Sequence, residues 1–110
     1  MEITIQSFDG CPNRDLLEQR LAQALNSCGG DVTIAHHSVE TPEDAARVGF
    51  RGSPTVLIDG VDPFAEGHAF VGLACRVYRT ADGPSGSPSV AQLRAAIEDA
   101  TTGQGEGSAL

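Results

Sequence analysis

At 110 residues, of which 40% are hydrophobic, the chain is long enough for one domain with its own hydrophobic core. It carries 15 acidic against 7 basic residues, for a formal net charge of -8 at pH 7. Such a surface repels phosphate backbones and anionic lipid, so we expect neither nucleic acid nor a membrane as a partner.

The first half of the chain alternates predicted strands and helices. Residues 2–8 alternate apolar and polar side chains, which predicts a strand, and residues 12–27 place apolar side chains at helical spacing after a proline. A second strand is predicted over 31–39. A short second helix is expected to begin at Thr41, a capping residue followed by proline, and to end near Gly49.

The second half is predicted to hold two more strands and one more helix. The continuous apolar run at 55–58 indicates a strand buried on both faces. The other expected segments are an ordered loop (61–73), a fourth strand (74–80), a polar connector without regular structure (82–88), a helix (89–100) and a disordered tail (101–110). We therefore expect one domain over residues 1–100, followed by the tail.

The predicted order of elements is β-α-β-α-β-β-α, which indicates an α/β fold with a four-stranded mixed sheet flanked by helices. A right-handed crossover makes the first two strands parallel, and the third strand can run antiparallel beside the first. The end of the first strand then lies next to the start of the third. Cys11 and Pro54 are therefore expected to be neighbours at one edge of the sheet.

Cys11 is the leading candidate for a reactive side chain because it stands where the first strand hands over to the first helix. The free N–H groups and the dipole of a helix N-terminus favour a thiolate, and Arg14 adds positive charge, whereas Asp9 opposes it. A thiolate is a nucleophile and a ligand for soft metals. The alternative is a retained fold in which this cysteine has no catalytic role.

The segment 45–60 reads Ala-Ala-Arg-Val-Gly-Phe-Arg-Gly-Ser-Pro-Thr-Val-Leu-Ile-Asp-Gly, and with Cys11 it resembles the thioredoxin superfamily over nearly all of residues 2–100. The resemblance implies a thioredoxin-like fold, a cis Ser53–Pro54 bond and the attacking-thiol position for Cys11. The dithiol members of that family carry their second cysteine three residues further on, where this chain has Arg14.

The start Phe-Asp-Gly-Cys-Pro at 8–12 and the segment Gly-Leu-Ala-Cys-Arg-Val-Tyr at 72–78 are closer to a set of small bacterial thioredoxin-like proteins. Some members of that set carry selenocysteine, and some are labelled alkylmercury-lyase-like. In this fold the main chain before the cis-proline can pair with a bound peptide or thiol, which implies substrate-binding roles for Ser53, Pro54 and Thr55. The alternative is that the proline only shapes the core.

Cys75 is the candidate second thiol, but the simplest topology argues against it. If a strand over 74–80 pairs antiparallel with the third strand, Cys75 starts at the sheet end opposite Cys11, and five residues of strand span roughly 16 Å. Cys75 is therefore interpreted as a buried small side chain, unless the loop 61–73 folds back over the site. Cys28 is expected in the core.

The sequence says less about cofactors and the cellular compartment than about the thiol site. No Cys-x2-Cys or His-x3-His spacing occurs, so we expect neither a metal site nor another cofactor. The chain has three cysteines, an odd number, and no signal-peptide pattern at its start. These features favour the reducing cytoplasm over a disulfide framework.

The leading hypothesis is a monothiol oxidoreductase in which the Cys11 thiolate attacks a disulfide, sulfenic acid or peroxide, and a small external thiol resolves the product. Arg14 would stabilise the thiolate, and Ser53 with Pro54 would position a small thiol or a disulfide-containing protein. This hypothesis requires a Cys11 sulfur that solvent can reach. Two alternatives stay open: a binding or homodimerisation module without catalysis, and handling of soft metals or organomercurials by Cys11, Cys75 and Asp9.

Overall fold

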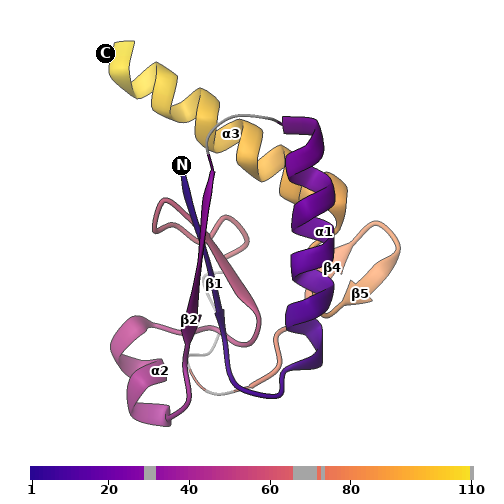
Figure 1. The fold of residues 1–110 in the computed structure, drawn as a ribbon, viewed down its shortest axis with the longest axis vertical. Coiled ribbons are helices and arrows are strands. Elements are labelled where there is room, and N and C mark those ends of the chain that lie inside the picture. The colour runs from indigo at the N-terminus through magenta and orange to yellow at the C-terminus, as the bar shows by residue number, and fades with distance from the viewer. Residues whose placement is uncertain (29–31, 66–71, 73, 110) are drawn as a thin grey trace.

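This computed structural model describes residues 1–28, 32–65, 72 and 74–109. The described residues form three helices and two small sheets (Figure 1). In chain order the elements are β1 (Glu2–Ser7), α1 (Pro12–Cys28), β2 (Thr33–Ser38), α2 (Pro42–Val48), β3 (Thr55–Ile58), β4 (Tyr78–Thr80), β5 (Gly83–Ser85) and α3 (Val90–Ala109). The expected α/β class is confirmed, and the first five elements occur in the predicted order.

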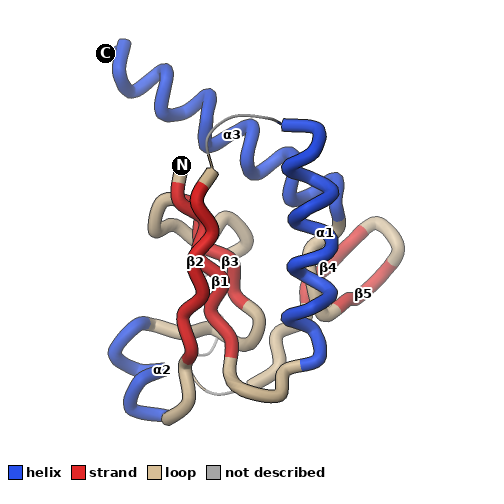
Figure 2. The backbone as a smooth tube through the Cα atoms, viewed as in Figure 1, coloured by secondary structure: helices blue, strands red, loops and turns tan. Residues whose placement is uncertain are grey.

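The main sheet has the strand order β2-β1-β3 (Figure 2). β1 runs parallel to β2, with Glu2 opposite Thr33, and antiparallel to β3, with Gln6 opposite Thr55. The end of β1 therefore lies beside the start of β3, as predicted. This register brings the turn that contains Cys11 to the same end of the sheet as Ser53.

The prediction of a fourth strand in this sheet is wrong. β4 is limited to three residues and pairs antiparallel with β5 in a separate hairpin, so the connector predicted to be irregular contributes a strand. Gly83 has a φ of 105°, which a residue without a side chain adopts readily, and Thr80 Oγ1 donates to its carbonyl oxygen at 2.6 Å. The chain reverses over two residues, and closing so short a loop costs less entropy than pairing with the distant β3.

α3 begins with reciprocal caps, since Gln92 N donates to Ser89 Oγ at 3.1 Å and Ser89 N donates to Gln92 Oε1 at 2.9 Å. Its backbone is helical to Ala109, where the composition predicts a disordered tail over 101–110. No helix in the described part of the chain is long and apolar enough to cross a membrane.

The main core fills the space between the sheet and the layer formed by α1 and α3, with α2 on the other side of the sheet (Figure 1). Its buried side chains come from β1, β3 and the two helices: Ile3, Ile5, Leu17, Leu21, Ala24, Val56, Ile58, Leu93 and Ile97. A smaller buried cluster packs Ala45 of α2 against Val39 and Phe50, which flank this helix on either side. The predicted ends of α2 are confirmed, because Thr41 Oγ1 accepts from Asp44 N and Gly49 is left-handed with φ 67°.

Two isoleucines on neighbouring strands test this assignment of the core. Ile5 on β1 is 1% exposed, whereas Ile34 on β2 is 43% exposed. We expect Ile5→Ala to lower the free energy of unfolding by about 2–5 kcal/mol, because it leaves a cavity. The control Ile34→Ala is expected to cost about 1 kcal/mol or less. Urea denaturation followed by circular dichroism measures both, and equal losses would contradict the assignment.

Candidate thiol site

Cys11 lies in the turn between β1 and α1 and immediately precedes the helix. Its N–H donates to the Phe8 carbonyl oxygen at 3.3 Å, and its own carbonyl oxygen accepts from Arg14 N at 3.3 Å. Gly10, with φ 79°, lets the chain turn at this point. The predicted placement of the sulfur at a helix N-terminus is therefore confirmed.

Cys11 is a free thiol, and only 6% of its surface is exposed. The structure thus does not provide the open sulfur that the hypothesis from the sequence requires. A reactant of a few atoms can approach such a position more readily than a folded protein can. The burial of Cys11 therefore favours a small substrate over a protein substrate.

The Ser53–Pro54 bond is cis, as the resemblance implies, and Ser53, Pro54 and Thr55 are all buried. The Phe8 N–H donates to Ser53 Oγ at 3.4 Å. Phe8 also holds the turn of Cys11 through its carbonyl oxygen. Phe8 therefore links the Cys11 turn to Ser53, at the end of the sheet where the predicted topology brings them together.

Both main-chain polar groups of Ser53 are already paired within the chain. Its N–H donates to the Ala74 carbonyl oxygen at 2.8 Å, and its carbonyl oxygen accepts from Arg76 N at 3.0 Å, which forms a parallel bridge to Cys75. The segment 74–76 thus occupies the main chain that the resemblance assigns to a bound peptide. A peptide can pair with Ser53 only after this segment leaves.

Gly52 permits this close approach. A Cβ atom at position 52 would lie 2.9 Å from Arg76 Cβ and 3.2 Å from the Ala74 carbonyl oxygen. The φ of Gly52 is 115°, a conformation that residues with side chains rarely adopt. Any larger residue would push the segment 74–76 away from Ser53.

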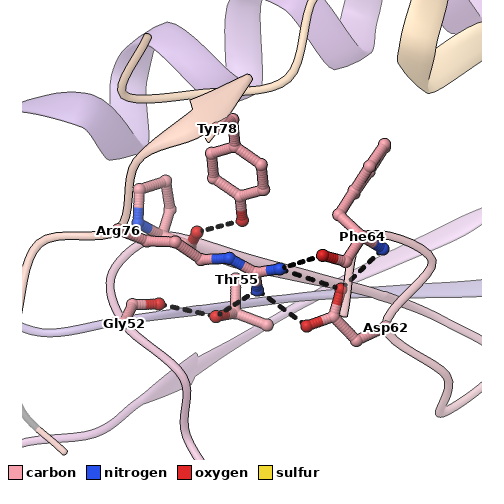
Figure 3. A network of polar contacts seen from close by, with 7 residues as sticks. Gly52, Thr55, Asp62, Phe64, Arg76 and Tyr78 are labelled. Carbon is pink, nitrogen blue, oxygen red and sulfur yellow. Dashed lines mark hydrogen bonds and ion pairs between the residues drawn. The ribbon is translucent and has the colours of Figure 1, made fainter. Parts of the chain in front are cut away.

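The guanidinium of Arg76 holds the segment in place (Figure 3). Arg76 Nη1 lies 2.7 Å from Asp62 Oδ2, and the two side chains are 9% and 10% exposed. Arg76 also donates to the Phe64 carbonyl oxygen at 2.8 Å and to Thr55 Oγ1 at 3.3 Å. We call Arg76 with these three partners the Arg76 clamp. It fixes the main chain one residue after Cys75.

Tyr78 adds a second anchor. Its hydroxyl donates to the Pro54 carbonyl oxygen at 2.6 Å, and its ring lies edge-on to Phe64 and under the Arg76 guanidinium, 4.6 Å from ring centroid to Cζ. Burial raises the pKa of Tyr78 far above its ordinary value, although the charge of Arg76 opposes the shift. The hydroxyl therefore stays protonated at ordinary pH and keeps its role as a donor.

The interpretation of Cys75 as a buried side chain is wrong, because Cys75 is a free and exposed thiol. Its predicted position at the far end of the sheet is also wrong, since it is bridged to Ser53 at the end where Cys11 lies. The sequence does contain a signal that points to this arrangement. Gly52, directly before Ser53, is the residue type that a close approach of two backbones requires.

Arg14, predicted to stabilise the thiolate, lies in the first turn of α1 as expected. Its Nε is 3.9 Å from Asp15 Oδ1 and has no hydrogen-bond partner, although that atom is buried. The hydrogen bond recorded between Arg14 and Cys11 is the main-chain contact at 3.3 Å. The role of the Arg14 side chain at the sulfur stays a prediction.

Asp9 and Cys28 are the remaining residues named from the sequence. Asp9 is exposed, and its N–H donates to Glu40 Oε1 at 2.9 Å. The side chain of Cys28, which is expected in the core, lies outside the described part of the structure. Within the described part, no group of three or more His, Cys, Asp or Glu side chains is placed to hold a metal ion.

A hollow of about 680 Å³ lies between the end of β3 and α3, lined in part by Phe64, Ala96 and Asp99. None of the predicted site residues lines it. No cysteine among the described side chains lines it, so we place the thiol chemistry at Cys11 rather than in this hollow.

The Arg76 clamp predicts a strongly non-additive pair of substitutions. Arg76→Met leaves the Asp62 carboxylate buried without its partner, so we expect a loss of about 3–5 kcal/mol in the free energy of unfolding. Adding Asp62→Asn removes that charge and should restore part of the loss. Urea denaturation of both single variants and the double variant measures the coupling. Additive effects would contradict a buried ion pair that anchors the segment 74–76.

Comparisons with known proteins do not add a family to this description. No family of known proteins, no curated protein and no solved structure matches the chain. Membership of the thioredoxin superfamily stays a prediction from the motifs quoted above.

Proposed function

We propose that the chain is a thiol redox protein of thioredoxin-like fold in which the Cys11 sulfur reacts with a small electrophile of the peroxide or disulfide type. The observation that carries the proposal is the position of Cys11, at the start of α1 and one turn from the contact between Phe8 and Ser53. The sulfur thus stands at a junction of β1, α1 and the segment before β3.

The position of Cys11 favours thiolate chemistry. α1 is 17 residues long, and the positive end of its dipole stabilises negative charge close to its N-terminus. Cysteines activated for attack on peroxides or disulfides commonly stand at such helix starts. Arg14 adds a positive charge in the same turn.

Two observations favour a small reactant over a protein disulfide. Cys11 is 6% exposed, so a large partner cannot approach its sulfur closely. The main chain of Ser53, which would pair with a peptide substrate, is already bonded to Ala74 and Arg76. A hydroperoxide of a few atoms can reach a sulfur that is only slightly exposed, and it needs no free strand edge.

With a hydroperoxide, the Cys11 thiolate attacks one peroxide oxygen. A sulfur–oxygen bond forms, the oxygen–oxygen bond breaks, and the alcohol or water leaves after taking up a proton. The sulfur becomes a sulfenic acid, having lost two electrons to the peroxide. A thiol then attacks that sulfur and expels water, and a second thiol releases Cys11 from the resulting disulfide.

A homodimerisation module is the second candidate, and one observation favours it. β2 is one of the two outer strands in the order β2-β1-β3, and its Ile34 is 43% exposed. An outer strand with an apolar side chain is a ready surface for pairing with a second chain. Light scattering on the reduced protein and on Ile34→Lys tests this: a dimer that the substitution dissociates supports it, and a monomer at all concentrations contradicts it.

The redox proposal predicts that Cys11→Ser loses the reaction with peroxide. Reduced protein is mixed with hydrogen peroxide and dimedone, and the cysteine-containing peptides are examined by mass spectrometry. We expect dimedone on Cys11 of the natural chain, and peroxide consumption at the background rate in Cys11→Ser. The free energy of unfolding of the variant serves as the control, because serine replaces cysteine with little change in volume. Equal peroxide consumption by both proteins would end the proposal.

A further inference from the structure

We propose that Cys75 is the resolving thiol for Cys11, so that the oxidised protein carries an intramolecular Cys11–Cys75 disulfide. The inference rests on the proposed function and deepens it, because it supplies from within the chain a thiol that would otherwise come from outside. The observation behind it is the parallel bridge between Ser53 and Cys75.

Ser53 contacts both segments that carry the two thiols. On one side its Oγ accepts from Phe8 N at 3.4 Å, and the Phe8 carbonyl oxygen accepts from Cys11 N at 3.3 Å. On the other side its main chain bonds the residues before and after Cys75 at 2.8 and 3.0 Å. Adjacent strands lie about 4.8 Å apart. Cys75 is therefore one strand spacing from the residue that contacts the Cys11 turn.

The backbone of Cys75 is held firmly, whereas its side chain is exposed. Gly52 permits the close approach, and the Arg76 clamp fixes the next residue through a buried ion pair. A free cysteine that serves only packing is usually buried, yet Cys75 is exposed. A fixed main chain that presents an exposed thiol at the end of the sheet where the enclosed Cys11 lies favours a resolving step.

The step balances without a further co-reactant. Once a hydroperoxide has converted Cys11 to the sulfenic acid, the Cys75 sulfur attacks the Cys11 sulfur. A sulfur–sulfur bond forms, the sulfur–oxygen bond breaks, and the hydroxyl leaves as water with the proton of the Cys75 thiol. Two thiols have then given two electrons to one peroxide.

The exposures of the two cysteines also predict which sulfur an external thiol attacks when it reduces the Cys11–Cys75 disulfide. An external small thiol reaches the exposed Cys75 sulfur more easily than the enclosed Cys11 sulfur. It attacks Cys75, forms a mixed disulfide there and releases Cys11 as the thiolate. A second external thiol then frees Cys75 and leaves as the oxidised small disulfide.

Peptide mapping tests the proposal directly. All seven basic residues are arginines, and trypsin therefore places the three cysteines on three separate peptides, 1–14, 21–47 and 52–76. Reduced protein is treated with one equivalent of hydrogen peroxide, its free thiols are blocked, and the digest is analysed without reduction. We expect peptide 1–14 linked to peptide 52–76. In Cys75→Ser we expect this link to disappear and dimedone labelling of Cys11 to increase.

A matched pair of glycine variants tests the geometry. Gly52→Ala forces the segment 74–76 away from Ser53, whereas a Cβ atom at Gly60, also left-handed with φ 84°, meets no atom within 4 Å. We expect Gly52→Ala to slow formation of the disulfide about 10- to 100-fold, because misplacement of reacting groups is costly, and Gly60→Ala to leave it unchanged. Dimedone labelling of Cys11 under rapid mixing reports the first step separately.

The outcomes separate this inference from the proposed function. Dimedone labelling of Cys11 in the natural chain without a link between peptides 1–14 and 52–76 would overturn the role of Cys75 and leave the redox proposal standing. A link from Cys11 to peptide 21–47 would transfer the resolving role to Cys28 and also overturn the inference. No oxidation of Cys11 at all would overturn both proposals.

Discussion

The pairing of the segment 74–76 with the Ser53 main chain is the contact on which the thiol site depends. It satisfies the main-chain N–H and carbonyl oxygen of the buried Ser53. The Ser53 hydroxyl also accepts from the N–H of Phe8, the residue after β1. The pairing also places Cys75 at the same end of the sheet as Cys11. Because unpaired polar groups inside a protein are costly, this pairing is retained unless another strand replaces it.

A buried ion pair stabilises that pairing. Arg76 and Asp62 both lose their water, which costs more than a surface ion pair does, and the cost is offset by the carbonyl of Phe64 and the ring of Tyr78. Such a pair adds little net stability compared with an apolar alternative, but it admits few other arrangements. Its effect is to select one path for the chain between β3 and β4.

In the proposed chemistry, the two cysteines have different roles because Cys11 is buried and Cys75 is exposed. The enclosed Cys11 meets only small oxidants, which protects its sulfenic acid from bulky thiols, while the exposed Cys75 exchanges with external reductants. The chain has Arg14 where dithiol members of the resembled family have their second cysteine. A thiol delivered by a distant segment takes over the role that the neighbouring cysteine would have.

The sequence by itself determined the part of the structure from β1 to β3. The alternation in β1, the cap at Thr41, the stop at Gly49 and the position of Cys11 before α1 all depend on neighbours within a few residues, so periodicity and capping rules reveal them. Only the tertiary structure decided the course of 74–80, the exposure of Cys75 and the occupation of Ser53. Those features depend on contacts between residues 14 to 24 positions apart, such as those of Arg76 and Tyr78, and no periodic pattern encodes which distant partner a strand or an arginine selects.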